Sequence, residues 1–191
     1  MRKIGLPAAV PTICAILAAC SSSGGAAGPK GGNATDAAPS DSDVVDCSSD
    51  RLAEAYAPGM KAMGSSGNFQ VQLVSVSVEN SQGQEVQEPP AKGVNQWIVK
   101  VLDKSGNPVT GVTFPPETTS PWPSGWPIGV LPYMPYHGHA SSTWPTMTAN
   151  ADGTFTIDGV NLFMAGVWQV TFHVKANSET DSAVFGFCVP G

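Results

Sequence analysis

The feature that most constrains this chain is a series of short segments in which apolar and polar residues alternate. Residues 165–176 read AGVWQVTFHVKA, with a large apolar residue at every second position from Trp168 onward. A period of two is the pattern of a β-strand with one buried face. Similar patterns recur in residues 69–80, 95–103, 109–114, 154–159 and 181–189. With 21 glycines and 17 prolines available for turns, the chain is predicted to form an all-β, antiparallel β-sandwich of about seven strands.

Two local irregularities are expected within this framework. In residues 69–80, FQVQLVSVSVEN, the alternation changes phase at Leu73 and Val74, which predicts a β-bulge. Residues 48–56, SSDRLAEAY, have the composition of one or two helical turns, with Ser48 or Ser49 as the N-cap. The patterns leave the order of the strands open.

Residues 115–136 do not follow the strand pattern, because they hold seven of the 17 prolines. Each proline removes a backbone donor, so a central strand would not tolerate this density. We expect an extended, ordered loop or an edge segment, with Trp122 and Trp126 packed as a lid over one end of the sandwich. These two tryptophans are also the pair to test for stacking with a ligand.

The N-terminal residues have the composition of an export signal. Arg2 and Lys3 precede an apolar run that ends at Ala19, which predicts a signal peptide over residues 1–19. Its last residues and Cys20 read LAAC, the pattern of a bacterial lipobox in which the cysteine is lipidated. The alternative is an ordinary signal peptide cleaved near Ala19 that leaves Cys20 free. Ser21 after the cysteine favours the outer membrane, on either its periplasmic or its cell-surface side.

A small, polar and acidic segment, residues 20–46, separates this signal from the predicted domain over residues 47–191. Such a composition cannot form a core and predicts a disordered, flexible tether. A coil of this length has a root-mean-square reach of roughly 25–30 Å, which would hold the domain close to a membrane.

The four cysteines divide into two groups under this interpretation. Cys14 is removed with the signal peptide and Cys20 carries the lipid, which leaves Cys47 and Cys188 in an oxidising compartment. We expect these two to form a disulfide; the alternative is two separate thiols. The formal net charge of −6 and the absence of a basic cluster argue against nucleic-acid binding, so membrane contact is expected through the lipid.

Three motifs in this sequence resemble those of YtkA-like domains, which belong with the FixH-like group of exported or membrane-tethered β-sandwiches. They are W-x-V-x-V-x-D-x-x-G-x-P-V-x-G-V at 97–112, M-P-x-H-G-H at 134–139 and DGTFTIDGVNLFMAGVWQVTFHV at 152–174. The resemblance covers about residues 69–175 and implies an immunoglobulin-like fold. Relatives near copper and heavy-metal export systems imply a metal connection and a protein partner in a metal-export or envelope system. Family loops often carry more methionine and glycine where this chain has Pro135 and Tyr136.

The residues of this loop themselves suggest a metal site. His137 and His139 are two positions apart, so both could face one ion, and Met134 could add a thioether. Imidazole suits Cu, Zn and Ni, while a thioether suits Cu(I), so copper is the predicted ion. Alternatively, Gly138 provides a bend and each imidazole bonds to backbone. No Asp or Glu lies between Glu117 and Asp152, which argues against a site for a hard ion.

Other candidates near this loop carry weaker signals. Met147 is a further sulfur ligand to consider, whereas Met164 is expected in the core and His173 on the exposed face of its strand. The sequence has none of the common hydrolase, dithiol, metalloprotease or phosphate-loop motifs, so we do not expect an enzyme. Two functions stay open: a copper-binding accessory protein, or a structural or protein-interaction module that binds no metal.

Overall fold

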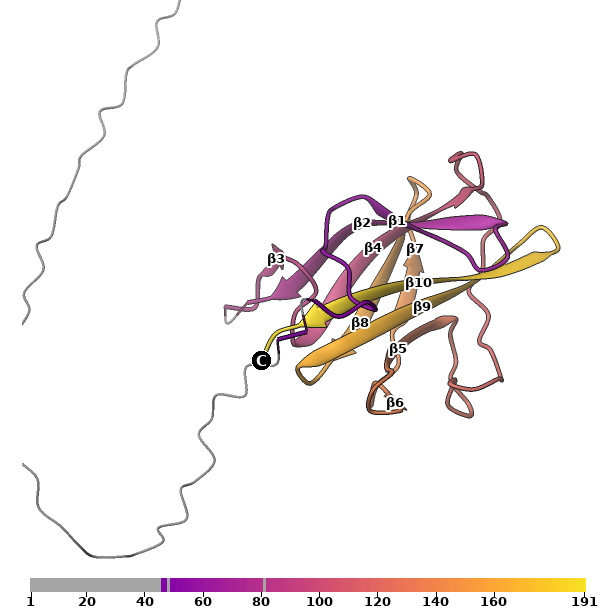
Figure 1. Ribbon diagram of the computed structural model, residues 1–191. Coiled ribbons are helices and arrows are strands. Elements are labelled where there is room, and N and C mark those ends of the chain that lie inside the picture. Colours follow the sequence, from indigo (N-terminus) through magenta and orange to yellow (C-terminus); the bar gives the residue numbers. More distant parts are fainter. Residues whose placement is uncertain (1–45, 48, 81) are drawn as a thin grey trace, which may run out of the picture. The chain divides into compact units, whose positions relative to one another are not determined.

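The computed structural model describes residues 46–47, 49–80 and 82–191, and within them the chain is all-β. The described part contains ten strands: β1 Met60–Met63, β2 Phe69–Glu79, β3 Glu85–Gln87, β4 Gly93–Asp103, β5 Val130–Met134, β6 His139–Ala140, β7 Thr146–Ala149, β8 Phe155–Leu162, β9 Gly166–Ala176 and β10 Glu179–Val189. They form two antiparallel sheets (Figure 1). The prediction of an antiparallel β-sandwich is confirmed. The predicted signal peptide, the predicted lipidation site Cys20 and nearly all of the predicted tether lie outside the described residues.

The first sheet, sheet A, has the order β1-β2-β4-β8-β7, with β3 also paired to β2. The second, sheet B, has the order β10-β9-β5-β6. The strand number exceeds the expected seven because several strands are short: β1, β3, β6 and β7 each have four residues or fewer. Segments of that length cannot display a repeated alternation, so the sequence pattern does not reveal them.

The core lies between the inner faces of the two sheets and is rich in aromatic rings. Trp97 of β4 is fully buried, with its ring centroid 5.7–6.4 Å from those of Phe172, Phe185 and Phe187. The predicted bulge is confirmed, since the β2–β4 register shifts between Leu73 and Ser75. The bulge moves β2 by one position, so that buried Leu73 is followed by buried Val76.

Cys47 and Cys188 form the predicted disulfide, which fastens the first described residues to β10. Further along, the Glu54 amide donates to the Gly186 carbonyl at 2.8 Å, and a Cβ on Gly186 would overlap the Leu52 backbone. The helical turns expected over 48–56 are not formed in the described part of that segment. Its described residues run beside β10 and form only isolated turns. The disulfide and the backbone bond to Gly186 hold them there, so the turns do not continue into a helix.

Residues 109–114 were expected to form a strand, and this prediction is wrong. Residues 108–114 form isolated bridges in place of a strand, Pro108 with Leu102 and Thr113 with Lys175. The first bridge is to β4 of sheet A and the second to β9 of sheet B. The segment therefore crosses from one sheet to the other, and its alternation reflects the burial of Phe114 rather than a position within a sheet.

The Pro/Trp-rich stretch is ordered as predicted, but its tryptophans cover a face rather than an end. Residues 130–134 form β5, in which Val130 and Met134 belong to the core while Leu131 points to the opposite side. Trp122 and Trp126 pack against Leu131 on that outer face, and the Trp126 indole donates to the Val130 carbonyl at 2.9 Å. The two rings therefore cover the outer side of β5 around Leu131.

A candidate metal-binding tip

The sequence motif M-P-x-H-G-H forms the turn between β5 and β6, and we call residues 134–140 the tip. The amides of His137 and Gly138 both donate to the Met134 carbonyl, at 3.2 and 2.9 Å. Gly138 has φ of 69°, a conformation that favours glycine, and it lets the chain reverse between the two histidines. The turn therefore holds His137 and His139 on a short, hydrogen-bonded loop.

The two imidazoles lie close together, with ring centroids 5.7 Å apart. Metal–nitrogen bonds of about 2.0–2.1 Å place two rings on one ion with centroids roughly 4.5–6.5 Å apart, depending on the bond angle. The observed spacing is within that range. His137 is exposed and His139 is half-buried.

The surroundings of His139 determine which of its nitrogens could bind an ion. Its Nδ1 lies 3.2 Å from the Ala140 carbonyl, which can only accept, so Nδ1 carries the proton. In the neutral ring Nε2 then keeps its lone pair for a metal. The ring also stacks on Phe163 of the β8–β9 turn, with centroids 5.6 Å apart and planes at 21°. His139 is therefore held by two contacts, as a pre-oriented ligand or a structural residue would be.

Met134 is placed differently from the expectation that it would be an accessible third ligand. It is opposite His139 in the β5–β6 pairing, yet it is only 1% exposed and belongs to the core. A Cβ on Gly166 would come within 2.8 Å of its terminal methyl group. The reason is the strand period, because residue 134 shares the inward face of β5 with Val130. The tip thus presents an exposed His137 and a half-buried His139, while the thioether of Met134 is buried in the core.

His173 is not the exposed surface residue that its strand pattern suggested. Its side chain is 13% exposed, with Nδ1 2.9 Å from the Pro115 carbonyl and Nε2 3.2 Å from Glu117 Oε1. The Pro-rich segment crosses this face of β9 and supplies both partners. His173 therefore fastens that segment to sheet B, and it does not join the tip.

The other methionines and tryptophans considered as ligand-binding residues pack against the protein itself. Met147 and Met164 are partly buried and pack against the core, as expected for Met164. Trp122 and Trp126 are buried around Leu131, so neither offers a free face for stacking. Across residues 46–47, 49–80 and 82–191, no group of three or more His, Cys, Asp or Glu side chains is arranged to hold a metal ion.

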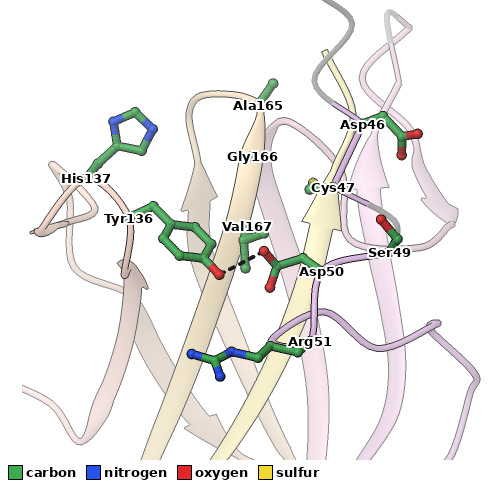
Figure 2. A pocket seen from close by; sticks show the side chains of 10 residues that line it. All are labelled: Asp46, Cys47, Ser49, Asp50, Arg51, Tyr136, His137, Ala165, Gly166 and Val167. Atoms are coloured by element: carbon green, nitrogen blue, oxygen red, sulfur yellow. Dashed lines mark hydrogen bonds between the residues drawn. The ribbon is translucent and has the colours of Figure 1, made fainter.

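A trough of about 610 Å³ lies beside the tip, on the outer face of sheet B (Figure 2). Tyr136 and His137 line one wall, and the start of β9 forms the floor. The other wall consists of Asp46, Cys47, Ser49, Asp50 and Arg51. Tyr136 Oη donates to Asp50 Oδ2 at 2.8 Å, which joins the two walls. The Leu52 amide and then Tyr136 lower the pKa of Asp50, and the same bond to Asp50 raises the pKa of Tyr136.

The sequence did not point to Asp50, Arg51 or Tyr136 as neighbours, because 86 positions separate Asp50 from Tyr136. The one available signal was the predicted disulfide. It brings residue 47 to the end of β10, which is next to the start of β9.

Comparison of the chain with protein-family models gives no match, and comparisons with curated proteins and with solved structures give none either. The resemblance to YtkA-like domains accordingly stays a prediction from the quoted motifs. Within the described part of the chain, no helix is both long enough and apolar enough to cross a membrane.

Proposed function

We propose that this chain is a non-catalytic, extracytoplasmic lipoprotein, anchored to the outer membrane through Cys20, whose YtkA-like β-sandwich binds copper at the tip. The signal-like residues 1–19, the LAAC pattern and the Cys47–Cys188 disulfide support export and anchoring. The protein partner would belong to a metal-export or envelope system. Nucleic acid is not a partner in this proposal.

The observation that carries the copper proposal is the pair of imidazoles at the tip. His137 and His139 are close enough to share one ion, and the bond from His139 Nδ1 to the Ala140 carbonyl leaves Nε2 as the ligand. Two nitrogen ligands with the remaining positions open to water suit Cu(II), which stands above Zn²⁺ and Ni²⁺ in the general order of affinities.

The burial of Met134 changes which oxidation state is expected. A thioether would favour Cu(I), but that of Met134 packs in the core against Gly166. The proposal therefore specifies Cu(II) held by two imidazoles, with water or a partner's ligand completing the coordination.

A second candidate function is a structural or protein-interaction module that binds no metal. The stacking of His139 on Phe163 favours it, because a ring used for packing needs no ion. Trp122 and Trp126 support the same view, since both are committed to covering β5. In this case the His-Gly-His turn only orders the end of the sandwich, and a partner protein docks on the Pro/Trp-rich segment.

A copper titration of the full chain separates the two candidates. The wild type is compared with His137→Ala and His139→Ala, and His173→Gln is the matched control because it removes the third histidine at a different site. Loss of a ligand should weaken Cu(II) binding by at least about tenfold, since even outer-shell changes cost 10–100-fold. The control should bind like the wild type. Equal binding by all four proteins would leave the interaction module as the better account.

The anchor is tested separately by growing cells with labelled palmitate. The wild type should incorporate the label, and Cys20→Ala should not. Incorporation by the variant would contradict the assignment of Cys20, whatever the copper result.

A further inference from the structure

The first described residues of the domain lie beside the tip. Asp46 and Cys47 line the same trough as Tyr136 and His137, on opposite walls (Figure 2). The preceding 45 residues, which include the apolar run up to Ala19, therefore connect to the domain at this end. A tether of this composition reaches only roughly 25–30 Å, so an anchored chain keeps this end near the membrane.

The same end carries most of the exposed large apolar side chains. Among the described residues six such side chains are exposed, and four of them lie here: Val94, Tyr136, Trp144 and Phe163, each 37–60% exposed. A soluble protein exposes single apolar residues routinely, but a group at one end is the usual mark of a contact surface.

Contacts between neighbouring residues connect these four side chains. Phe163 stacks on His139, whose ring is next to that of His137, and Tyr136 precedes His137 in the chain. On the other side, Val94 pairs with Asn161, and Asn161 Nδ2 donates to Thr143 Oγ1 at 3.5 Å, directly before Trp144. We call this group, Val94, Tyr136, His137, His139, Trp144 and Phe163, the end surface.

The end surface is also poor in negative charge, although the chain is acidic overall. No carboxylate occurs between Glu117 and Asp152, a stretch that contains the tip and Trp144, and none occurs in residues 159–178 around Phe163. Two carboxylates, Asp46 and Asp50, line the adjoining trough, and Tyr136 donates to that of Asp50. The six residues of the end surface therefore present no carboxylate of their own to anionic headgroups.

We propose that the end surface rests on the phospholipid headgroups of the membrane to which the chain is anchored. Trp, Tyr and Phe at this position have the chemistry of a membrane interface, with a ring for the acyl boundary and, in Trp and Tyr, a polar group for the headgroups. The contact can be weak, because a short flexible tether gives an effective concentration in the mM range. This inference rests on the proposed anchor at Cys20. It implies that copper at His137 and His139 is taken up and released beside the membrane.

The test is hydroxyl-radical footprinting of the full lipidated chain on vesicles of phosphatidylethanolamine and phosphatidylglycerol. Tyr136, Phe163 and Trp144 should be oxidised several-fold more slowly than in the Cys20→Ala chain mixed with the same vesicles. Met63 is an internal control, because it is 52% exposed and pairs with Gln70 at the opposite end of β2. Its rate should be the same in both samples.

Two substitutions refine the test. Phe163→Ser in the anchored chain should restore part of the oxidation of Tyr136, whereas Met63→Ser should not. The chain concentration on the vesicles is then varied, because protection by a second copy would rise with surface density and protection by lipid would not.

The outcomes are distinct. Equal rates for Tyr136 and Phe163 in anchored and unanchored chains overturn the inference, as does protection that depends on surface density or extends equally to Met63. Failure of the wild-type chain to float with the vesicles contradicts the proposed anchor instead. A chain that floats while its end surface stays reactive overturns this inference alone.

Discussion

Replacing Asp181 with asparagine should strongly destabilise the sandwich, because this buried carboxylate organises the β1–β2 turn. Its Oδ1 accepts from the amides of Ser66 and Ser182, and its Oδ2 from those of Asn68 and Phe69, at 2.8–3.2 Å. In Asp181→Asn one oxygen remains as an acceptor, while an amide group faces two N–H donors. Two hydrogen bonds to a charged group are then lost.

The magnitude follows from those two bonds. Each is worth about 1.5–3 kcal/mol when the acceptor is charged, so the loss is about 3–6 kcal/mol of unfolding free energy. The close fit of Gly64 against this carboxylate leaves no room for the turn to move toward a new partner. Urea unfolding followed by far-UV circular dichroism measures the difference, with Asp158→Asn, whose carboxylate meets only the Gln96 side chain, as the matched control.

The effect should also depend on pH. Burial alone would raise the pKa of Asp181, but the four backbone amides outweigh it and the pKa is lowered. Because the folded pKa is below the unfolded value of about 3.9, the stabilisation is present at neutral pH and is lost as pH falls below about 4. The stability of Asp181→Asn should therefore fall less steeply in acid. A loss below about 1 kcal/mol at pH 7, or the same acid slope as the wild type, would refute the reasoning.

Three further predictions concern the tip and the disulfide. Met134→Leu should leave Cu(II) affinity unchanged and cost less than about 1.5 kcal/mol of stability, because it conserves core volume; a large loss of Cu(II) binding by titration would return the thioether to the site. Tyr136→Phe should raise the pKa of Asp50 toward its ordinary value, since it removes a hydrogen bond to the carboxylate; an NMR pH titration with an unchanged midpoint would contradict this. Cys47→Ser with Cys188→Ser should lower stability by about 5 kcal/mol, the loop-closure entropy of a 141-residue separation; a change in urea midpoint equivalent to less than half of that would contradict it.

The sequence predicted the parts of the fold in which local pattern and tertiary burial agree. The strands β2, β4, β8, β9 and β10 each bury one face against the other sheet, so alternation identified them, and the slip at Val74 marked a real bulge. The disulfide followed from counting cysteines rather than from any local pattern.

The sequence analysis missed the parts of the fold whose conformation is determined by tertiary contacts. Residues 109–114 alternate like a strand, yet they pass between the sheets, and only the pairing of Thr113 with Lys175 reveals it. β5 contains Pro132 and belongs to the stretch that was expected to be an extended, ordered loop or an edge segment. It pairs with β9 because that edge of the strand does not need the missing donor.

For the candidate site, the sequence identified the loop correctly but not the direction of each side chain. The spacing placed His137 and His139 near each other, as observed. The inward direction of Met134 depends on the phase of β5, which Pro132 conceals. The neighbourhood of Asp50 and Tyr136 depends on a long-range contact that no local pattern encodes.

The most direct test of the central claim is pulsed electron paramagnetic resonance of Cu(II) bound to the full chain at one equivalent. This measurement counts the imidazoles bound to the ion through the remote ring nitrogens. We predict two imidazoles in the wild type and in His173→Gln, and one in either His137→Ala or His139→Ala. A signal without coordinated imidazole, or the same signal in the double variant His137→Ala/His139→Ala, would contradict a copper site at the tip.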